Sequence, residues 1–364
     1  MKKTIYRSNV SYISSSALIL FITFLSVTSS IAPLQAQACS RFVYHGVNSQ
    51  IITARSMDWK EDIASDIWIL PRGIARNGQA GPNSIKWTAK YGSVVTTAYD
   101  IATTDGLNEK GLVANLLWLA DSEYPKPDKN KPAMAISLWA QYILDNYATV
   151  KEAVTALQAE PFHVYTAEVP GQKRLATLHL SISDSSGDSA IIEYIGGKQV
   201  IHHNRQYQVM TNEPTYEKQL AIQDYWKEVD GIAMLPGTSR PADRFARASF
   251  YVSAIPKSKD PEEALASVFG VIRNVSVPLG ISTPNRPNIS STRWRSVVDH
   301  KRLLYFFESV MTPNVFWVDL KQVDFSADKG KVKKLSLGKN QRTIYAGNAT
   351  SSFQNSAPFK FLGL

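Results

Sequence analysis

The 364-residue chain contains a single cysteine, Cys39. An internal disulfide needs two cysteines, so the fold has to be stabilised by packing without one. Long apolar runs are also lacking: the stretch from Ala17 to Val27 is interrupted by Thr and Ser and is shorter than the roughly 20 apolar residues that cross a bilayer. We therefore expect no disulfide and no stable membrane span.

Charge of one sign is only mildly in excess, with 40 Lys and Arg residues against 31 Asp and Glu residues. The basic residues are scattered apart from short clusters such as 331–334, which is typical of a solvated surface rather than of a nucleic-acid-binding face. The sequence has no His-x-x-x-His pattern, no cysteine pair, no carboxylate cluster at ligand spacing and no phosphate-binding loop. We expect no metal, no cofactor and no nucleic-acid partner.

The first 38 residues have the pattern of a secretory signal peptide. They combine three basic residues and no acidic residue with a short apolar middle, and Ala36 and Ala38 stand at positions minus three and minus one. Cleavage before Cys39 would leave 326 residues, 39–364, with no linker-like segment that divides them. We expect residues 1–38 to be removed and residues 39–364 to form a single domain in a periplasmic or secreted protein. Lipid attachment at Cys39 is the alternative, but the lipobox leucine is absent.

The apolar pattern predicts strands, then helices, then strands again. Residues 40–44 and 50–54 predict a hairpin, and Thr149 with Glu152 predicts a capping box for a helix to residue 158. Asp105–Gly111 is interpreted as a structural turn between strands. The other predicted strands are 94–99, 112–119, 175–183, 190–194, 199–202, 207–211, 294–298, 302–307 and 315–318, and the other predicted helices are 133–146, 241–254 and one that begins near Pro261. This grouping favours an α+β fold with stacked layers.

Cys39 at a new N-terminus would carry a nucleophile and a base in one residue. An unperturbed thiol has a pKa of about 8.5 and an α-amine one of about 7.7 to 8.0, so the amine can take the thiol proton near neutral pH. No histidine is then needed. A Cys-His-Asn protease is the rival interpretation, but no histidine stands in a recognisable signature.

The segment "CSRFVYHG…ITARSMDW" resembles the start of the choloylglycine hydrolase family, and "DGLNEKGL", "MTNEPTY" and "SRPADRFAR" are similar to further motifs of that family. The resemblance covers essentially all of residues 39–364 and implies the four-layer αββα sandwich of N-terminal nucleophile hydrolases. It also implies a set of catalytic residues: Cys39 as nucleophile, Arg55, Asp58, Asn212 as oxyanion donor, and Arg244. Asp58 would orient the amine or thiol, and the two arginines would favour the thiolate.

Two tryptophans bear on the substrate. Trp118 stands where bile salt hydrolases commonly have Asn, and Trp59 follows Asp58 directly; both are similar to the Gram-negative penicillin V acylase branch, where such residues line the acyl pocket. The resemblance therefore implies a cysteine amidase for phenoxyacetyl or fatty acyl amides, such as penicillin V and N-acyl-homoserine lactones, and a homotetramer. The alternatives are a bile salt hydrolase and, in another class, an envelope protein lipidated at Cys39 that binds acyl groups without hydrolysing them.

Overall fold

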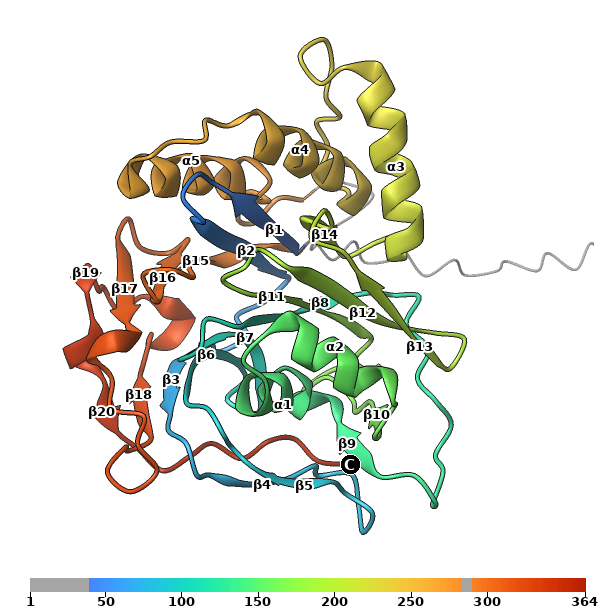
Figure 1. The fold of residues 1–364 in the computed structure, drawn as a ribbon, viewed down its shortest axis with the longest axis vertical. Helices are drawn as coiled ribbons and strands as arrows, with labels where there is room; N and C mark the ends of the chain where they lie inside the picture. The colour runs from blue at the N-terminus through green and yellow to red at the C-terminus, as the bar shows by residue number, and fades with distance from the viewer. Residues whose placement is uncertain (1–38, 283–289) are drawn as a thin grey trace, which may run out of the picture. The chain divides into compact units, whose positions relative to one another are not determined.

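The computed structural model describes residues 39–282 and 290–364, which belong to one compact unit, Gln35–Leu364. The predicted signal peptide, 1–38, lies outside the described residues. Two large β-sheets are stacked on one another and helices cover their outer faces, so the layers run α, β, β, α (Figure 1). This order confirms the α+β sandwich expected from the sequence. No helix in the described part of the chain is long and apolar enough to cross a membrane.

Within the described residues, the strands form two large sheets and two small ones. The first large sheet has seven strands in the order β14 (Val209–Thr211), β1 (Ser40–His45), β2 (Ile51–Trp59), β15 (Ser291–Asp299), β16 (Leu304–Ser309), β17 (Val315–Asp319) and β19 (Gly347–Asn348). The second has nine, in the order β13 (Lys198–His203), β12 (Ser189–Ile195), β11 (Leu178–Ser183), β8 (Val113–Trp118), β7 (Ala102–Asn108), β6 (Ser93–Ala98), β3 (Ile67–Leu70), β18 (Lys333–Leu335) and β20 (Gln354–Asn355). The small sheets pair β4 (Ala75–Asn77) with β5 (Lys86–Thr88) and β9 (Ala133–Ala135) with β10 (His163–Tyr165).

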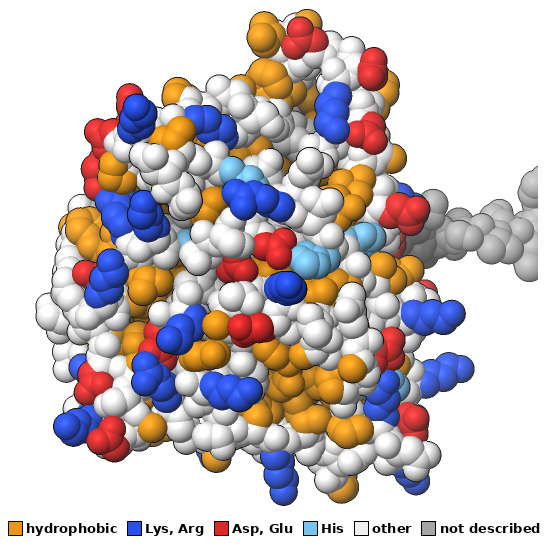
Figure 2. All heavy atoms as spheres, in the orientation of Figure 1, with side chains coloured by type: hydrophobic (Ala, Val, Ile, Leu, Met, Phe, Trp, Pro, Cys, Tyr) orange, Lys and Arg blue, Asp and Glu red, His pale blue; other side chains and the backbone are white. Residues whose placement is uncertain are grey.

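The helices divide between the outer faces of the two large sheets. The seven-stranded sheet is covered by α4 (Pro241–Ala254) and α5 (Pro261–Asn274), and α3 (Tyr216–Val229) packs beside α4; α1 (Trp139–Asn146) and α2 (Val150–Gln158) cover the nine-stranded sheet (Figure 1). Short 3-10 helices are η1 (Ile136–Leu138), η2 (Leu320–Gln322), η3 (Lys339–Gln341) and η4 (Thr350–Ser352). On the surface drawn in Figure 2, basic and acidic side chains are interspersed.

Several local predictions are confirmed. The strands β1 and β2 pair antiparallel as the expected hairpin, and α4 has the predicted bounds. At the start of α2, Thr149 Oγ1 accepts a hydrogen bond from Glu152 N at 3.2 Å, while Glu152 Oε2 accepts one from Ala148 N at 2.9 Å. Thr149 therefore satisfies one of the backbone donors that a helix start leaves without partners, and Glu152 fixes the chain just before the cap.

Other predictions are wrong at particular residues. The helix expected over 133–146 begins only at Trp139, because Ala133–Ala135 pairs with β10 as a parallel strand. The strand at 209–211 does not continue the meander but pairs with β1 in the other sheet. The expected turn over 105–111 is too long, because residues 105–108 are the end of β7. Helix α3 was not predicted from the sequence.

Strand β2 separates two environments, because all nine of its residues are buried between the helix layer and the second sheet. Successive side chains of a strand point to opposite faces. Arg55 bonds backbone carbonyls of the nine-stranded sheet, whereas Asp58 is bonded by Thr292 and lies near Arg244 of α4. Odd-numbered positions near the end of β2 thus face the other sheet, and even-numbered positions face the helices.

A β-bulge in β15 lets neighbouring residues of that strand contact the two different faces of β2. The register between β15 and β2 shifts between Thr292, which pairs with Asp58, and Trp294, which pairs with Met57. The extra residue between them reverses the alternation, since a bulge sets two residues of one strand opposite one of its partner. Thr292 consequently reaches Asp58, while the Trp294 ring lies 4.9 Å from the Arg55 guanidinium on the other face.

Candidate active site

Cys39 lies directly before β1, is 3% exposed, and presents its three polar groups to different partners. Its nitrogen donates a hydrogen bond to Asn212 Oδ1, and its carbonyl oxygen accepts one from Arg244 Nη1 at 2.8 Å. Its Sγ lies 3.4 Å from the Asp58 nitrogen and 3.9 Å from Met57 Sδ, and it lines the largely apolar cavity described below. The backbone of Cys39 is therefore held by polar groups while its sulfur faces the cavity.

The polar groups around the Cys39 backbone form a buried set, here called the polar cluster: Asp58, Asn212, Arg244 and Thr292. Asp58 accepts hydrogen bonds from Thr292 Oγ1 at 2.5 Å and Ser56 Oγ at 3.3 Å, and its Oδ2 is 3.9 Å from Arg244 Nη1. Burial raises the pKa of Asp58 to about 6, although Arg244 and the Thr292 hydrogen bond lower it. Asp58 is thus a carboxylate that titrates not far below neutral pH.

Asn212 is brought to Cys39 by strand register. It directly follows β14, in which Thr211 pairs with Ser40, so the next residue reaches Cys39. Its Oδ1 accepts hydrogen bonds from the Cys39 nitrogen and from Arg244 Nη2, the latter at 3.2 Å. Its Nδ2 donates to the carbonyl oxygen of Trp118 at 2.9 Å. Asn212 therefore connects the polar cluster to the cavity wall.

Arg55 lies on the other face of β2 and is fully buried. Its guanidinium donates to the carbonyl oxygens of Thr104 at 3.1 Å and Leu116 at 2.6 Å, and Nη1 is 3.6 Å from Asp105 Oδ2. These partners come from β7 and β8 of the second sheet. The charge of Arg55 thus belongs to the interface between the sheets, beside the cavity rather than in the polar cluster.

The thiol is not held as a ready-made thiolate. Burial raises the pKa of Cys39 above its usual value, and the nearby Asp58 carboxylate adds to this. Arg55 and Arg244 act in the expected direction and lower the pKa, but burial outweighs them. The two arginines thus favour the thiolate, as the sequence predicts, but burial has the larger effect on the pKa, and a base has to take the proton.

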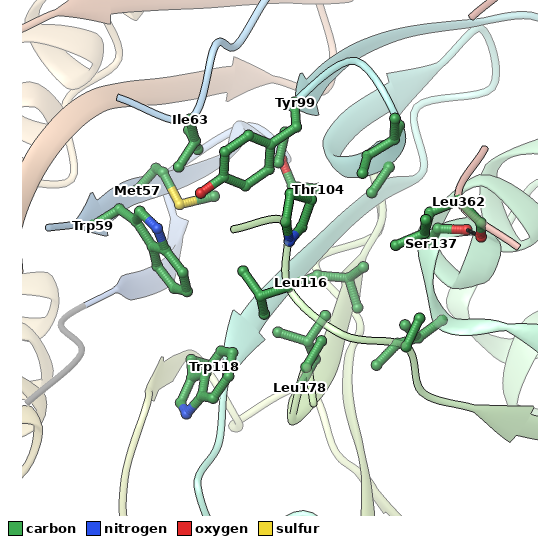
Figure 3. A pocket seen from close by; sticks show the side chains of 18 of the residues that line it. Met57, Trp59, Ile63, Tyr99, Thr104, Leu116, Trp118, Ser137, Leu178 and Leu362 are labelled. Atoms are coloured by element: carbon green, nitrogen blue, oxygen red, sulfur yellow. Dashed lines mark hydrogen bonds between the residues drawn. The ribbon is translucent and has the colours of Figure 1, made fainter. Parts of the chain in front are cut away.

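The cavity beside Cys39 has a volume of about 120 Å³, is partly open to solvent and is lined mainly by apolar side chains. Trp59 and Trp118 lie at one end and Ser137 and Leu362 at the other (Figure 3). The two indole rings have centroids 5.7 Å apart and planes tilted by 56°. The guanidinium of Arg174 lies 4.2 Å from the Trp118 ring centroid and 5.5 Å from that of Trp59. Two aromatic rings beside a thiol suit an apolar or aromatic acyl group.

The structure brings the five predicted catalytic residues and both tryptophans into or beside one site, while their chemical roles stay predictions. Sequence reasoning missed Met57, Thr292 and Asp105. Met57 follows from the alternation along β2, which puts it between Arg55 and Trp59 on one face. Thr292 and Asp105 come from distant strands and leave no local signal. Among the described residues, no group of three or more His, Cys, Asp or Glu side chains is placed to hold a metal ion.

Comparison with known proteins identifies the family of the chain. The family model "Linear amide C-N hydrolases, choloylglycine hydrolase family" matches residues 39–333, which confirms the family expected from the motifs. The chain is 56% identical over 348 residues to a penicillin V acylase of Pectobacterium atrosepticum, covering 90% of this chain and 93% of the relative.

Solved structures of related proteins match the fold of this chain. The structure of penicillin V acylase from Agrobacterium tumefaciens matches with a TM-score of 0.85 and 62% identity, covering 90% of this chain and all of the other. A variant of the conjugated bile acid hydrolase from Clostridium perfringens matches with a TM-score of 0.68 and 21% identity, covering 82% of this chain and 96% of the other. The second likeness, at this low identity, shows the shared fold alone.

Proposed function

The chain belongs to the choloylglycine hydrolase family of linear amide C–N hydrolases, and from that premise we propose that it is an exported penicillin V acylase with Cys39 as its nucleophile. It would convert penicillin V and water to phenoxyacetic acid and 6-aminopenicillanic acid. The observation that carries the proposal is the placement of Cys39, whose sulfur faces the cavity beside two indoles while its nitrogen lies on Asn212.

The α-amine is the proposed base. In the 364-residue chain the Cys39 nitrogen belongs to a peptide bond, and removal of residues 1–38 would turn it into an amine with an ordinary pKa of about 7.7 to 8.0. The family match begins at residue 39, which supports cleavage at this point. Export to the periplasm or medium follows from the same signal pattern. The homotetramer expected from the resemblance stays a prediction.

Catalysis would proceed through an acyl-enzyme. Cys39 Sγ attacks the amide carbonyl carbon as its proton moves to the α-amine, because burial keeps the resting thiol protonated. The tetrahedral oxyanion collapses when the amine passes that proton to the leaving nitrogen, which releases 6-aminopenicillanic acid and leaves a thioester. A water molecule, deprotonated by the same amine, then attacks the thioester, and phenoxyacetic acid departs as the thiol regains its proton.

The polar cluster would hold the amine in place for the proton transfers of both acylation and deacylation. Asn212 Oδ1 accepts the hydrogen bond from the Cys39 nitrogen, and Arg244 fixes the adjacent carbonyl oxygen. The Asn212 amide group, apart from its bond to the Trp118 carbonyl, has a second N–H available to the oxyanion. Asp58 keeps the arginine oriented and balances its buried charge.

Linear acyl chains are a second proposed substrate class. The cavity is bounded at its far end by aliphatic residues such as Ile101, Ile136 and Leu362, which would contact an aliphatic chain as well as an aromatic ring. We therefore propose that N-acyl-homoserine lactones are also hydrolysed, at the amide that joins the acyl chain to the lactone.

The test combines intact mass with hydrolysis by the recovered protein. A chain that begins at unmodified Cys39 and cleaves penicillin V supports the proposal, and Cys39→Ala should lower the rate by at least ~1000-fold. Cleavage of glycocholate in preference to penicillin V would identify a bile salt hydrolase instead. A diacylglyceryl group on Cys39, or unchanged hydrolysis by Cys39→Ala, would overturn the mechanism.

A further inference from the structure

Arg55 carries a positive charge where few groups can balance it. Two of its hydrogen bonds go to backbone carbonyl oxygens, and its Nη2 also lies 3.7 Å from Met57 Sδ, the atom that contacts Cys39 Sγ. Among the charges around the thiol, Arg55 acts most strongly to lower the pKa of Cys39. A buried cation in such surroundings is costly unless an anion accompanies it.

Asp105 supplies that anion. It is fully buried, and its Oδ2 lies 3.6 Å from Arg55 Nη1. The same oxygen accepts hydrogen bonds from Asn115 Nδ2 at 2.6 Å and Ser296 Oγ at 3.1 Å, and Oδ1 accepts one from the Tyr305 hydroxyl. Each oxygen of the Asp105 carboxylate therefore has at least one hydrogen-bond donor. A small rotation of the side chain would break some of these hydrogen bonds.

The partners of Asp105 join the two sheets. Asp105 and Asn115 belong to β7 and β8 of the nine-stranded sheet, whereas Ser296 and Tyr305 belong to β15 and β16 of the seven-stranded sheet. Tyr305 is itself fixed by Thr96 Oγ1 of β6 at 2.7 Å. The position of the carboxylate is thus set by side chains from both layers of the sandwich.

We propose that Asp105, held by Asn115, Ser296 and Tyr305, is a positioning residue that keeps the Arg55 guanidinium beside the Cys39 thiol and thereby sets the reactivity of the nucleophile. This inference rests on the proposed role of Cys39. It assigns a function to the "DGLN" segment, which the sequence indicated only as a turn. Asp105 does not line the cavity, so its influence on the reaction passes through Arg55.

The sign of the effect separates positioning from a direct effect of charge. If Asp105 acted on the thiol only through its own negative charge, Asp105→Asn would lower the pKa of Cys39. If Asp105 holds Arg55 in place, the same substitution releases the guanidinium and the pKa of Cys39 rises. We expect the second result, an upward shift of about one pH unit, so that alkylation at neutral pH becomes about tenfold slower.

The experiment follows alkylation of Cys39 by iodoacetamide against pH in the mature protein. Because Cys39 is the sole cysteine, the reaction reports on one thiol without an amide substrate. Asp145→Asn is the matched control: Asp145 is also a buried carboxylate, 3.1 Å from Arg76 in a different part of the fold. It should lower the melting temperature without moving the alkylation profile.

Two further variants keep the test decisive. Tyr305→Phe removes the hydroxyl that bonds both Asp105 and Thr96, without changing charge. It should shift the alkylation profile in the same direction by less, and this shift remains measurable if Asp105→Asn does not fold. In an Arg55→Met background, Asp105→Asn should shift the profile no further. An unchanged or lowered midpoint in Asp105→Asn, an equal shift in Asp145→Asn, or an additional shift without Arg55 would overturn the inference. If the unsubstituted mature protein does not hydrolyse penicillin V while its variants show the expected alkylation shifts, the proposed function fails and the inference about Asp105 stands.

Discussion

Asp58 and Trp59 are neighbours on β2, but they face environments of opposite kind. Asp58 points into the polar cluster beneath α4, where each group is fixed by hydrogen bonds to other buried groups. Trp59 points into the cavity, part of whose wall comes from irregular segments, including residues 167–170 and Leu362. Regular strands and a helix thus position the groups proposed for chemistry, whereas connecting segments contribute to the shape of the proposed acyl site.

This comparison has a functional consequence, because loops tolerate substitution better than buried strands do. Changes in the polar cluster should reduce the rate constant for every acyl group alike. Changes in the cavity should alter the preference among acyl groups and leave the chemistry largely intact. The predictions that follow test this division.

Asn212→Ala should have the largest effect among these tests. It removes the acceptor for the Cys39 nitrogen and the side-chain donor proposed for the oxyanion, and we expect kcat to fall by roughly 100- to 1000-fold. The loss should be similar for penicillin V and for an acyl-homoserine lactone, measured in parallel under saturating substrate. A loss confined to one of the two substrates would contradict the division between the faces of β2.

Trp118→Ala and Trp59→Ala should mainly affect substrate preference. Each removes an aromatic wall worth about 1.4 kcal/mol to a bound ring, so KM for penicillin V should rise about tenfold with a smaller change in kcat. A short aliphatic acyl substrate should be affected less. Trp87→Ala is the control, since Trp87 packs against Tyr142 and does not line the cavity. An equal rise in KM in the control would mean that the effect is not local.

The pH dependence should show the smallest effect. The proposed α-amine base gives a first limb of the profile, in which kcat/KM falls as pH drops below about 8. Because the pKa of Asp58 is about 6, a second limb should begin near pH 6, where kcat/KM falls more steeply as the carboxylate is protonated as well. The folded protein binds this proton more tightly than the unfolded chain, whose pKa is near 3.8, so Asp58 makes the fold more stable as pH falls from 6 to 4.

Activity and the Asp58 contribution to stability should therefore change in opposite directions across this range. Melting temperatures and initial rates measured at the same pH values separate protonation of Asp58 from unfolding. Asp58→Asn should abolish this limb of the profile. Retention of the same limb in Asp58→Asn would assign it to another group.

Features of the fold that depend on residues close together in the chain could be predicted from the sequence. The β1–β2 hairpin and the start of α2 depend on residues that are close along the chain, and α4 begins at Pro241, a residue favoured in the first helical turn. The helix predicted for residues 133–135 is wrong because their apolar spacing fits a buried helix and a buried strand equally well. These residues form a strand because they pair with residues 163–165.

The site was predictable only where family motifs mark it. The spacing of Cys39, Arg55 and Asp58 is carried by two adjacent strands, and Asn212 and Arg244 stand in motifs of their own. The sequence indicates Asp105 only as part of a turn, because its partners Arg55 and Tyr305 are on the facing sheet and far away in sequence. A single sequence contains no signal for such a contact between layers.

The bulge in β15 also matters to anyone who recombines parts of related enzymes. Arg293 is the additional residue in this bulge. It allows Thr292 to bond Asp58 on one face of the sheet while Trp294 packs against Arg55 on the opposite face. A chimera that imports β15 without this extra residue would keep the sheet but send either the hydroxyl or the indole to the wrong layer. Crossover points for such hybrids therefore belong outside residues 291–299, so that the strand is exchanged whole.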